Sequence, residues 1–159
     1  MRDKIVAGNW KMNNTLEDAK KLASEVVNMV NDEVTDNVKV IMAPSHPYLS
    51  TVKNLISTGS KVSLSAQNCH HEVSGAYTGE VSASMLKSLG CYSVIIGHSE
   101  RREYFNETNA QLAQKVDLAL TNGLIPIFCC GESLEIRESG KHEAFVNNQL
   151  TESIFHLSE

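Results

Sequence analysis

The feature that most constrains the fold is a repeated alternation of short apolar runs with helical patterns. The apolar runs are Ile5–Trp10, Val38–Ala43, Val62–Ala66, Tyr92–Ile96 and Leu124–Cys129. The second, fourth and fifth of these runs lack polar alternation, which is typical of strands buried on both faces, as in parallel sheets. Strand and helix alternating five times predicts parallel strands joined by right-handed crossovers.

Apolar residues at helical spacing lie after each run. They form five stripes: Leu16 to Val30, Leu49 to Ile56, Met85 to Leu89, Leu112 to Leu120 and Val146 to Leu157. Thr15 and Asp18 are spaced as a capping pair at the start of the first stripe. Asn106 is expected to lead into the fourth helix. Gly90 and Gly123 follow the third and fourth stripes, where they suit left-handed helix ends.

The length of 159 residues and a hydrophobic content of 42% favour one globular domain. A net charge of -5 leaves no basic stripe for nucleic acid, and no apolar run approaches the length of a membrane span. The start, Met1 to Lys4, leads directly into a strand pattern and does not resemble a signal peptide. We therefore expect a cytoplasmic protein with no nucleic-acid and no membrane partner.

Two architectures fit the alternation: a doubly wound sheet, or part of an eight-fold (β/α)8 barrel. A dinucleotide-binding doubly wound sheet would carry G-x-G-x-x-G after its first strand, whereas this chain has Gly8-Asn9-Trp10-Lys11. Polar and glycine residues instead follow four strands, in the segments 9–13, 67–79, 97–102 and 131–138. A barrel collects its chemistry from these strand ends, so the loops favour the barrel.

Two side chains near the end of the first apolar run, those of Asn9 and Lys11, could bind a substrate. Lys11 could direct its ammonium group at an anion in the barrel mouth, although a solvated surface lysine fits its position equally well. Asn9, two residues earlier, should share the same strand face. Its amide could bind a substrate or satisfy a buried backbone group.

His98 follows Gly97, which permits a sharp exit from the fourth strand. A histidine at the start of a helical turn lies in a positive field that disfavours its charged form. A neutral imidazole could donate a hydrogen bond to a substrate oxygen, and the alternative is a histidine bonded to backbone. Glu100 could pair with Lys11 or with an arginine, or be an ordinary exposed acid.

The segment Cys69-His70-His71-Glu72 holds metal-ligand residue types, but adjacent residues rarely point at one ion, so a polar loop is the better interpretation. Cys129 and Cys130 are too close for an ordinary disulfide. Without a secretory segment, the four cysteines, which also include Cys91, are expected to be free thiols in a reducing compartment. No metal site is predicted.

Several of these segments together resemble one known family. The matching motifs are Ala7-Gly8-Asn9-Trp10-Lys11-Met12-Asn13, Ala43-Pro44, Gly75-Ala76-Tyr77-Thr78-Gly79-Glu80, Gly97-His98-Ser99-Glu100-Arg101-Arg102 and Cys130-Gly131-Glu132. Their order and spacing resemble the triosephosphate isomerase family from Val6 to beyond Gly140. The resemblance identifies the chain as the N-terminal portion, 1–159, of a single TIM-barrel domain with five of eight β/α units.

The resemblance implies interconversion of dihydroxyacetone phosphate and D-glyceraldehyde 3-phosphate in glycolysis and gluconeogenesis, without metal or organic cofactor. It implies that Asn9 and Lys11 bind substrate and that His98 is the electrophile. The neutral histidine is a known property of this family's enzyme. Ser99 and Glu100 would support the reacting groups, with Glu100 holding Lys11. Met12 and Thr78 would lie at a homodimer interface.

Eight units typically need about 250 residues, so three units are expected to be absent, together with the family's glutamate base. Glu132 is the nearest acid by position, but a base must reach one particular carbon. We expect the chain alone to be inactive or nearly so. The alternative is a non-catalytic folding or interaction module, since an open sheet leaves two strand edges unpaired.

Overall fold

The computed structural model describes residues 4–35 and 37–157, so the start Met1 to Asp3 lies outside the described residues. Its five strands are β1 (Lys4–Asn9), β2 (Val38–Ala43), β3 (Val62–Ala66), β4 (Ser93–Ile96) and β5 (Ile125–Phe128). They form one sheet in the order β1-β2-β3-β4-β5, and every neighbouring pair is parallel. A doubly wound sheet reverses its strand order, whereas this sheet advances in one direction. The expected incomplete TIM barrel of five β/α units is confirmed.

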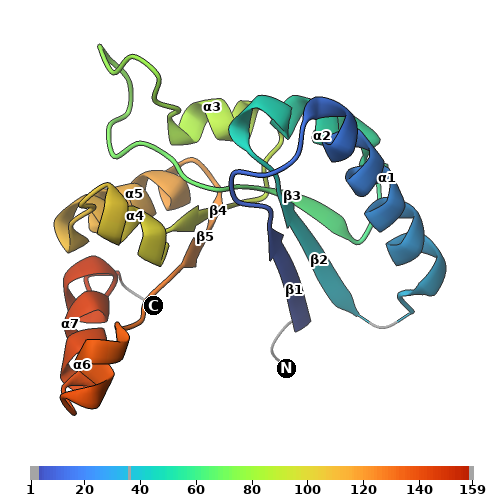
Figure 1. Ribbon diagram of the computed structural model, residues 1–159. Coiled ribbons are helices and arrows are strands. Elements are labelled where there is room, and N and C mark those ends of the chain that lie inside the picture. The colour runs from blue at the N-terminus through green and yellow to red at the C-terminus, as the bar shows by residue number, and fades with distance from the viewer. Residues whose placement is uncertain (1–3, 36, 158–159) are drawn as a thin grey trace.

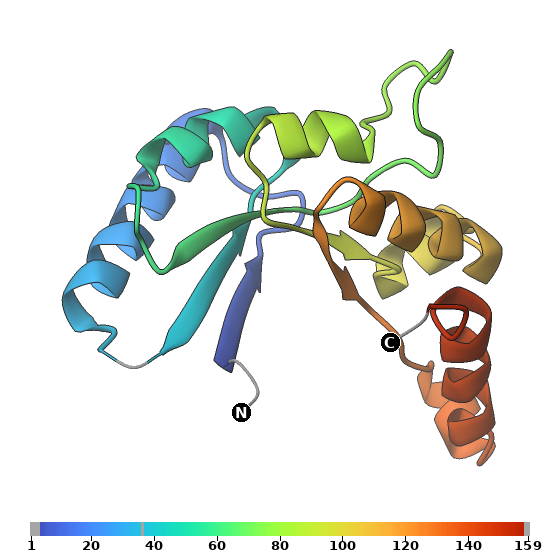
Figure 2. The same cartoon turned by 180° about the vertical axis from the view of Figure 1, so that it is seen from behind.

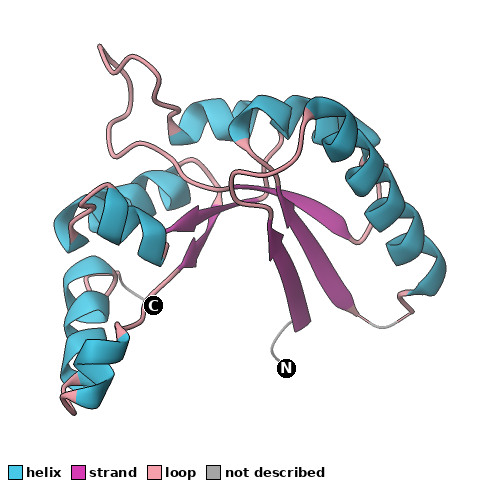
Figure 3. Ribbon diagram, in the orientation of Figure 1, coloured by secondary structure: helices cyan, strands magenta, loops and turns pink. Residues whose placement is uncertain are grey.

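The helices lie on the outer side of the curved sheet, and the strands fan out beneath them (Figure 1, Figure 3). The helical segments are α1 (Leu16–Glu33), η1 (His46–Tyr48), α2 (Leu49–Leu55), α3 (Ala83–Ser88), α4 (Ser99–Tyr104), α5 (Asn109–Thr121), α6 (Leu134–Glu138) and α7 (His142–Ser153). The view from behind shows the same arch, with α6 and α7 at one end and α1 at the other (Figure 2). Within the described ranges, no helix is both long and apolar enough to span a bilayer.

The core fills the space between the outer face of the sheet and these helices. Fully buried leucines come from a strand, Leu64, and from the helices α3 and α5, Leu86 and Leu112. Burial of each such side chain contributes about 1.5–3 kcal/mol. The strand β1, at one edge of the sheet, is much less covered: its Ile5 and Val6 are 52% and 61% exposed. The core therefore fixes the outer layer elsewhere, while β1 is exposed on both faces from Lys4 to Gly8.

Two capping boxes define where the long helices begin. At α1 the Thr15 hydroxyl accepts the Asp18 amide and the Asp18 carboxylate accepts the Thr15 amide, as predicted. The Thr15 hydroxyl also donates to the Asp18 carboxylate at 2.7 Å, and this bond and the one from the Thr15 amide lower the pKa of Asp18. The expectation for the fourth helix was wrong in detail. Asn106 has φ +53 and lies between α4 and α5, while α5 begins at Asn109 behind a second box of Thr108 and Gln111.

Three other expectations need correction. The segments 97–102 and 131–138 were expected to be loops, but they contain α4 and α6, which are too short and polar to show an apolar stripe. The fifth run was expected to be buried on both faces, yet Ile125 is 46% exposed because β5 is an edge strand. The last stripe also overran its helix, since α7 ends at Ser153 and leaves Leu157 outside it.

We predict that Thr108→Ala lowers the free energy of unfolding by about 1 kcal/mol, because the α5 amide of Gln111 loses its acceptor. Thr121→Ala, at the other end of the same helix, is the matched control and should change stability by less than about 0.5 kcal/mol. Urea denaturation followed by circular dichroism measures both. Equal losses in the two variants would contradict the capping role.

Candidate functional site

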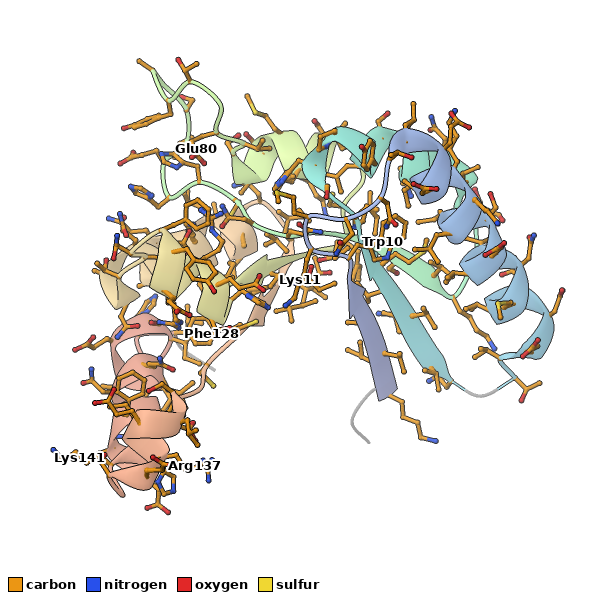
Figure 4. All side chains as sticks on the ribbon, viewed as in Figure 1. Trp10, Lys11, Glu80, Phe128, Arg137 and Lys141 are labelled. Carbon is orange, nitrogen blue, oxygen red and sulfur yellow. The ribbon has the colours of Figure 1, made fainter. Side chains whose placement is uncertain are left out.

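An open cleft of about 730 Å³ lies where the strands end. Asn9 and Lys11 line it from the end of β1, and His98 and Glu100 line it from the end of β4 and from α4. Figure 4 shows Lys11 near the centre of the molecule, between the end of β1 and α4. The structure therefore brings four of the residues singled out in the sequence into one cleft.

The backbone of Lys11 adopts a left-handed conformation, with φ +55. A non-glycine residue there costs on the order of 1–3 kcal/mol and persists only where its surroundings fix it. The Lys11 amide donates to Asn9 Oδ1 at 3.0 Å, and the Lys11 carbonyl accepts from Ser45 Oγ and Gln67 Nε2, both at 2.9 Å. Asn9 thus accepts a backbone amide, although this amide is exposed and not buried as one interpretation of the sequence held. These three side chains aim Lys11 into the cleft.

The Lys11 ammonium forms an ion pair with Glu100, with 2.6 Å between Nζ and Oε1. The hydrogen bond and the positive charge of Lys11 lower the pKa of Glu100. Both side chains are about half exposed, 50% and 41%, so the pair adds little to stability. Its effect is to direct Lys11, because a held ammonium presents its remaining donors to the cleft.

His98 is the N-cap of α4, and its Nδ1 accepts the Glu100 backbone amide at 3.3 Å. Glu100 Oε2 also lies 3.4 Å from Nδ1, and the two contacts require opposite protonation of that nitrogen. An amide is always a donor, and the other Glu100 oxygen already binds Lys11, so we assign Nδ1 as the bare acceptor. The proton of the neutral ring is then on Nε2, free to donate.

A buried charge network lies behind the cleft. Glu107 Oε1 accepts from Arg101 Nε and from Lys115 Nζ, both at 2.6 Å, and Lys115 also donates to Asn68 Oδ1 at 2.8 Å. Lys115 and Glu107 are 3% and 6% exposed. Burial alone would raise the pKa of Glu107, but the hydrogen bonds and charges of Lys115 and Arg101 outweigh it and hold this pKa below its ordinary value. The network joins the end of β3 to α4 and α5.

The other predicted site residues lie further from this centre. Ser99 begins α4, is exposed and does not line the cleft. Met12 lines the cleft and is 96% exposed, and Thr78 lies in the exposed segment 72–80, part of the loop before α3 that projects from the molecule (Figure 1). Met12 and Thr78 are thus accessible surface residues in this chain.

Residues considered for metal or base chemistry are engaged elsewhere. Burial raises the pKa of the Cys69 thiol to about 11, which keeps it protonated. His70 lies 3.4 Å from Glu80 and stacks on His71, and the described residues contain no group of three metal-ligand side chains. All four cysteines are free. Glu132 does not line the cleft, and Arg137 binds its Oε1 at 2.5 and 2.6 Å.

Comparisons with known proteins agree with this geometry. The family model described as triosephosphate isomerase matches residues 4–159. The triosephosphate isomerases of Cytophaga hutchinsonii and Porphyromonas gingivalis are 59% and 49% identical over 99% and 100% of this chain. The crystal structure of triosephosphate isomerase from Bartonella henselae superposes with a TM-score of 0.85 and 36% identity over 96% of the chain. The chain belongs to the triosephosphate isomerase family. It spans 62% of the length of each of these relatives.

Within the triosephosphate isomerase fold, sequence reasoning missed several supporting residues. Gln67 and Ser45 hold the Lys11 carbonyl across two loops, and no local pattern signals such contacts. Lys115 could have been found from the sequence, because it lies within the apolar stripe Leu112 to Leu120, where a lysine needs a buried partner. Arg101 and Arg102 were visible only as part of the family motif.

We predict that Glu107→Gln lowers the free energy of unfolding by about 3–5 kcal/mol, because the buried Lys115 and the partly exposed Arg101 lose their counter-charge. Since folding lowers the pKa of Glu107 below its ordinary 4.5, its contribution is complete above about pH 4.5 and is lost as pH falls through the folded value. Urea denaturation between pH 3 and 7, about 1.5 units below to 2.5 units above the ordinary pKa of 4.5, measures the loss of stability and its dependence on pH.

The variant should also lose stability less steeply than the parent below about pH 4.5, since one titrating group is gone. Glu25→Gln, on the exposed side of α1, is the control and should leave stability and its pH dependence unchanged. A pH dependence identical in parent and Glu107→Gln would contradict the assignment.

Proposed function

We propose that residues 1–159 provide the substrate-binding and carbonyl-polarising part of a triosephosphate isomerase site, which interconverts dihydroxyacetone phosphate and D-glyceraldehyde 3-phosphate in glycolysis and gluconeogenesis. The observation that carries this proposal is the meeting of Lys11, Glu100 and His98 in one cleft at the carboxyl ends of parallel strands. In barrels, this rim is where catalysis occurs.

His98 is the proposed electrophile. Because Nδ1 accepts the Glu100 amide, the Nε2 proton can donate to the substrate carbonyl oxygen and then shuttle between the two oxygens of the enediol. Lys11 supplies positive charge to the phosphate and to the developing enediolate, and Asn9 contributes its amide to substrate binding. Glu100 holds Lys11, and Ser99 supports the start of α4 beside His98. The proposal needs no metal and no organic cofactor.

The reaction also requires a base that removes a proton next to the carbonyl. The carboxylates among the described cleft residues are Glu80 and Glu100, and each is already paired, with His70 and with Lys11. Glu132 lies outside the cleft. We propose that the base belongs to the part of the family's barrel that lies beyond these five units. A base must lie within hydrogen-bond reach of the reacting carbon, and among the described residues the two cleft carboxylates are held by other partners.

We further propose a cytoplasmic homodimer in which Met12 and Thr78 contribute to the interface. The exposure of Met12 at the cleft edge and of Thr78 on a projecting segment supports this arrangement. Four free cysteines are consistent with a reducing compartment.

A second candidate function, a non-catalytic interaction module, is favoured by the open edges of β1 and β5 and by the exposed Ile5 and Val6. Its proposed partner is a second copy of this chain, which offers the same parallel edges. Sedimentation velocity tests it, since a monodisperse monomer across a range of concentrations excludes edge-driven assembly.

We predict that the 159-residue chain, with its mass verified, shows isomerase activity at or near background. The cause is the missing base rather than misfolding, so circular dichroism of the same sample should show an ordered α/β protein. A coupled assay in both directions measures the rate. Turnover comparable to that of complete enzymes would refute the proposed division of the site.

We predict that dihydroxyacetone phosphate perturbs the His98 imidazole resonances of the chain in nuclear magnetic resonance titrations. Lys11→Ala should weaken this binding at least tenfold, which corresponds to losing one charge-assisted contact of about 1.5–3 kcal/mol. Lys21→Ala on the exposed side of α1 is the charge-matched control and should bind as the parent does. Equal affinities for the two variants would contradict the role of Lys11.

A further inference from the structure

The guanidinium of Arg102 joins three elements directly behind His98. Its Nε donates to the Gly97 carbonyl at 2.8 Å, its Nη2 to the Cys129 carbonyl at 3.1 Å, and its Nη1 to Asn109 Oδ1 at 2.7 Å. These acceptors lie just after β4, just after β5 and at the first residue of α5. One planar group therefore fixes three chain segments with respect to one another.

Gly97 is the acceptor residue that leads directly into His98. Its φ is +78, and a Cβ there would lie 3.0 Å from both Arg102 Nη2 and the Cys129 carbonyl oxygen. The turn at Gly97 is thus packed against the hydrogen bond between Arg102 Nη2 and the Cys129 carbonyl. A side chain at Gly97 would therefore crowd both Arg102 and the Cys129 carbonyl.

Backbone hydrogen bonds hold the chain on the C-terminal side of His98. The His98 carbonyl accepts the amides of Arg101 and Arg102 at 2.9 and 3.2 Å. Arg102 therefore binds the carbonyls on both sides of the His98 α-carbon, one with its side chain and one with its amide. These two peptides set the direction of the His98 Cα–Cβ bond, and the bond from the Glu100 amide to Nδ1 then fixes the ring.

The network extends to the last helix. Asn109 Nδ2 donates to Glu152 Oε2 at 2.7 Å, and Ser153 Oγ donates to the Asn109 carbonyl at 3.4 Å. The Arg102 guanidinium also lies 5.6 Å from the ring centroid of Phe128, which Figure 4 labels at the end of β5. The position of α7 is therefore linked to the Gly97–His98 peptide through two side chains.

We propose that Arg102 is a positioning residue of this site: its guanidinium clamps the Gly97–His98 peptide to the end of β5 and so sets the direction in which the His98 imidazole points. The proposal rests on the proposed role of His98 as the electrophile. It assigns to Arg102 no contact with substrate.

The chemistry of the contacts requires arginine. All three acceptors are neutral oxygens in different directions, which suits the rigid, planar fork of a guanidinium and not the single compact ammonium of a lysine. Partial burial lowers the pKa of Arg102, yet an arginine stays charged in proteins. Arg102→Lys thus keeps the charge near His98 and removes only the geometry, which separates positioning from electrostatics.

The test measures the His98 ring without ligand, in the 159-residue chain carrying 15N-labelled histidine. At a pH about 1.5 units above the ordinary histidine pKa, the parent chain should show two well-separated His98 nitrogen resonances, a protonated Nε2 and a bare Nδ1. His98→Gln assigns them among the six histidines. Arg102→Lys should remove the separation as the tautomers average, while circular dichroism shows a folded chain.

Arg137→Lys is the matched control, since Arg137 also makes close contacts but outside the cleft, and it should leave the His98 resonances unchanged. If Arg102→Lys does not fold, Asn109→Ala decides, because it removes one anchor of the guanidinium and should shift the same resonances in the same direction. If Arg102→Lys folds and leaves the His98 resonances unchanged, the proposal is overturned. If it does not fold, unchanged resonances in Asn109→Ala overturn it. Failure of dihydroxyacetone phosphate to bind would count against the proposed function alone.

Discussion

The parallel alignment of the five strands is the constraint on which the rest of this structure depends. Each right-handed crossover returns the chain to the same end of the sheet, so every strand delivers its carboxyl end to one rim. Lys11 and Glu100 are 89 positions apart in sequence and still meet at 2.6 Å. A core of buried residues between sheet and helices keeps this rim in place, and the chemistry of the site occupies the loops above it.

These loops are held mainly by side chains that bind backbone groups. Gln67 and Ser45 bind the carbonyl of Lys11, and Arg102 binds the carbonyls of Gly97 and Cys129. Such bonds tie one loop to the next, which helix and strand ladders cannot do at a rim where the ladders end. The left-handed backbone of Lys11 shows the result: a conformation that is unfavourable alone is kept by its neighbours.

Local pattern predicted the scaffold well. The bounds of β2 and β3 and the capping box at Thr15 match the expectations from sequence, because buried strands and helix starts are encoded within a few residues. The failures have equally local causes. The short helices α4 and α6 bury no apolar stripe that a pattern could reveal, and the exposure of Ile125 depends on which strand lies at the sheet edge.

The sequence by itself determined the alternation of five strands with helices, the buried positions Ala19 to Val30 of α1, and the motifs that carry Asn9, Lys11 and His98, because these properties depend on residues close together in the chain. It did not determine the buried face of every helix: α7 buries Gln149 and Ser153 instead of its apolar stripe. The tertiary structure alone decided which groups touch. The pairing of Lys11 with Glu100, the burial of Lys115 against Glu107 and the three anchors of Arg102 each join segments that are distant in sequence or in different loops. Such contacts are set by how the strands stack around the barrel, and no short stretch of sequence contains that information.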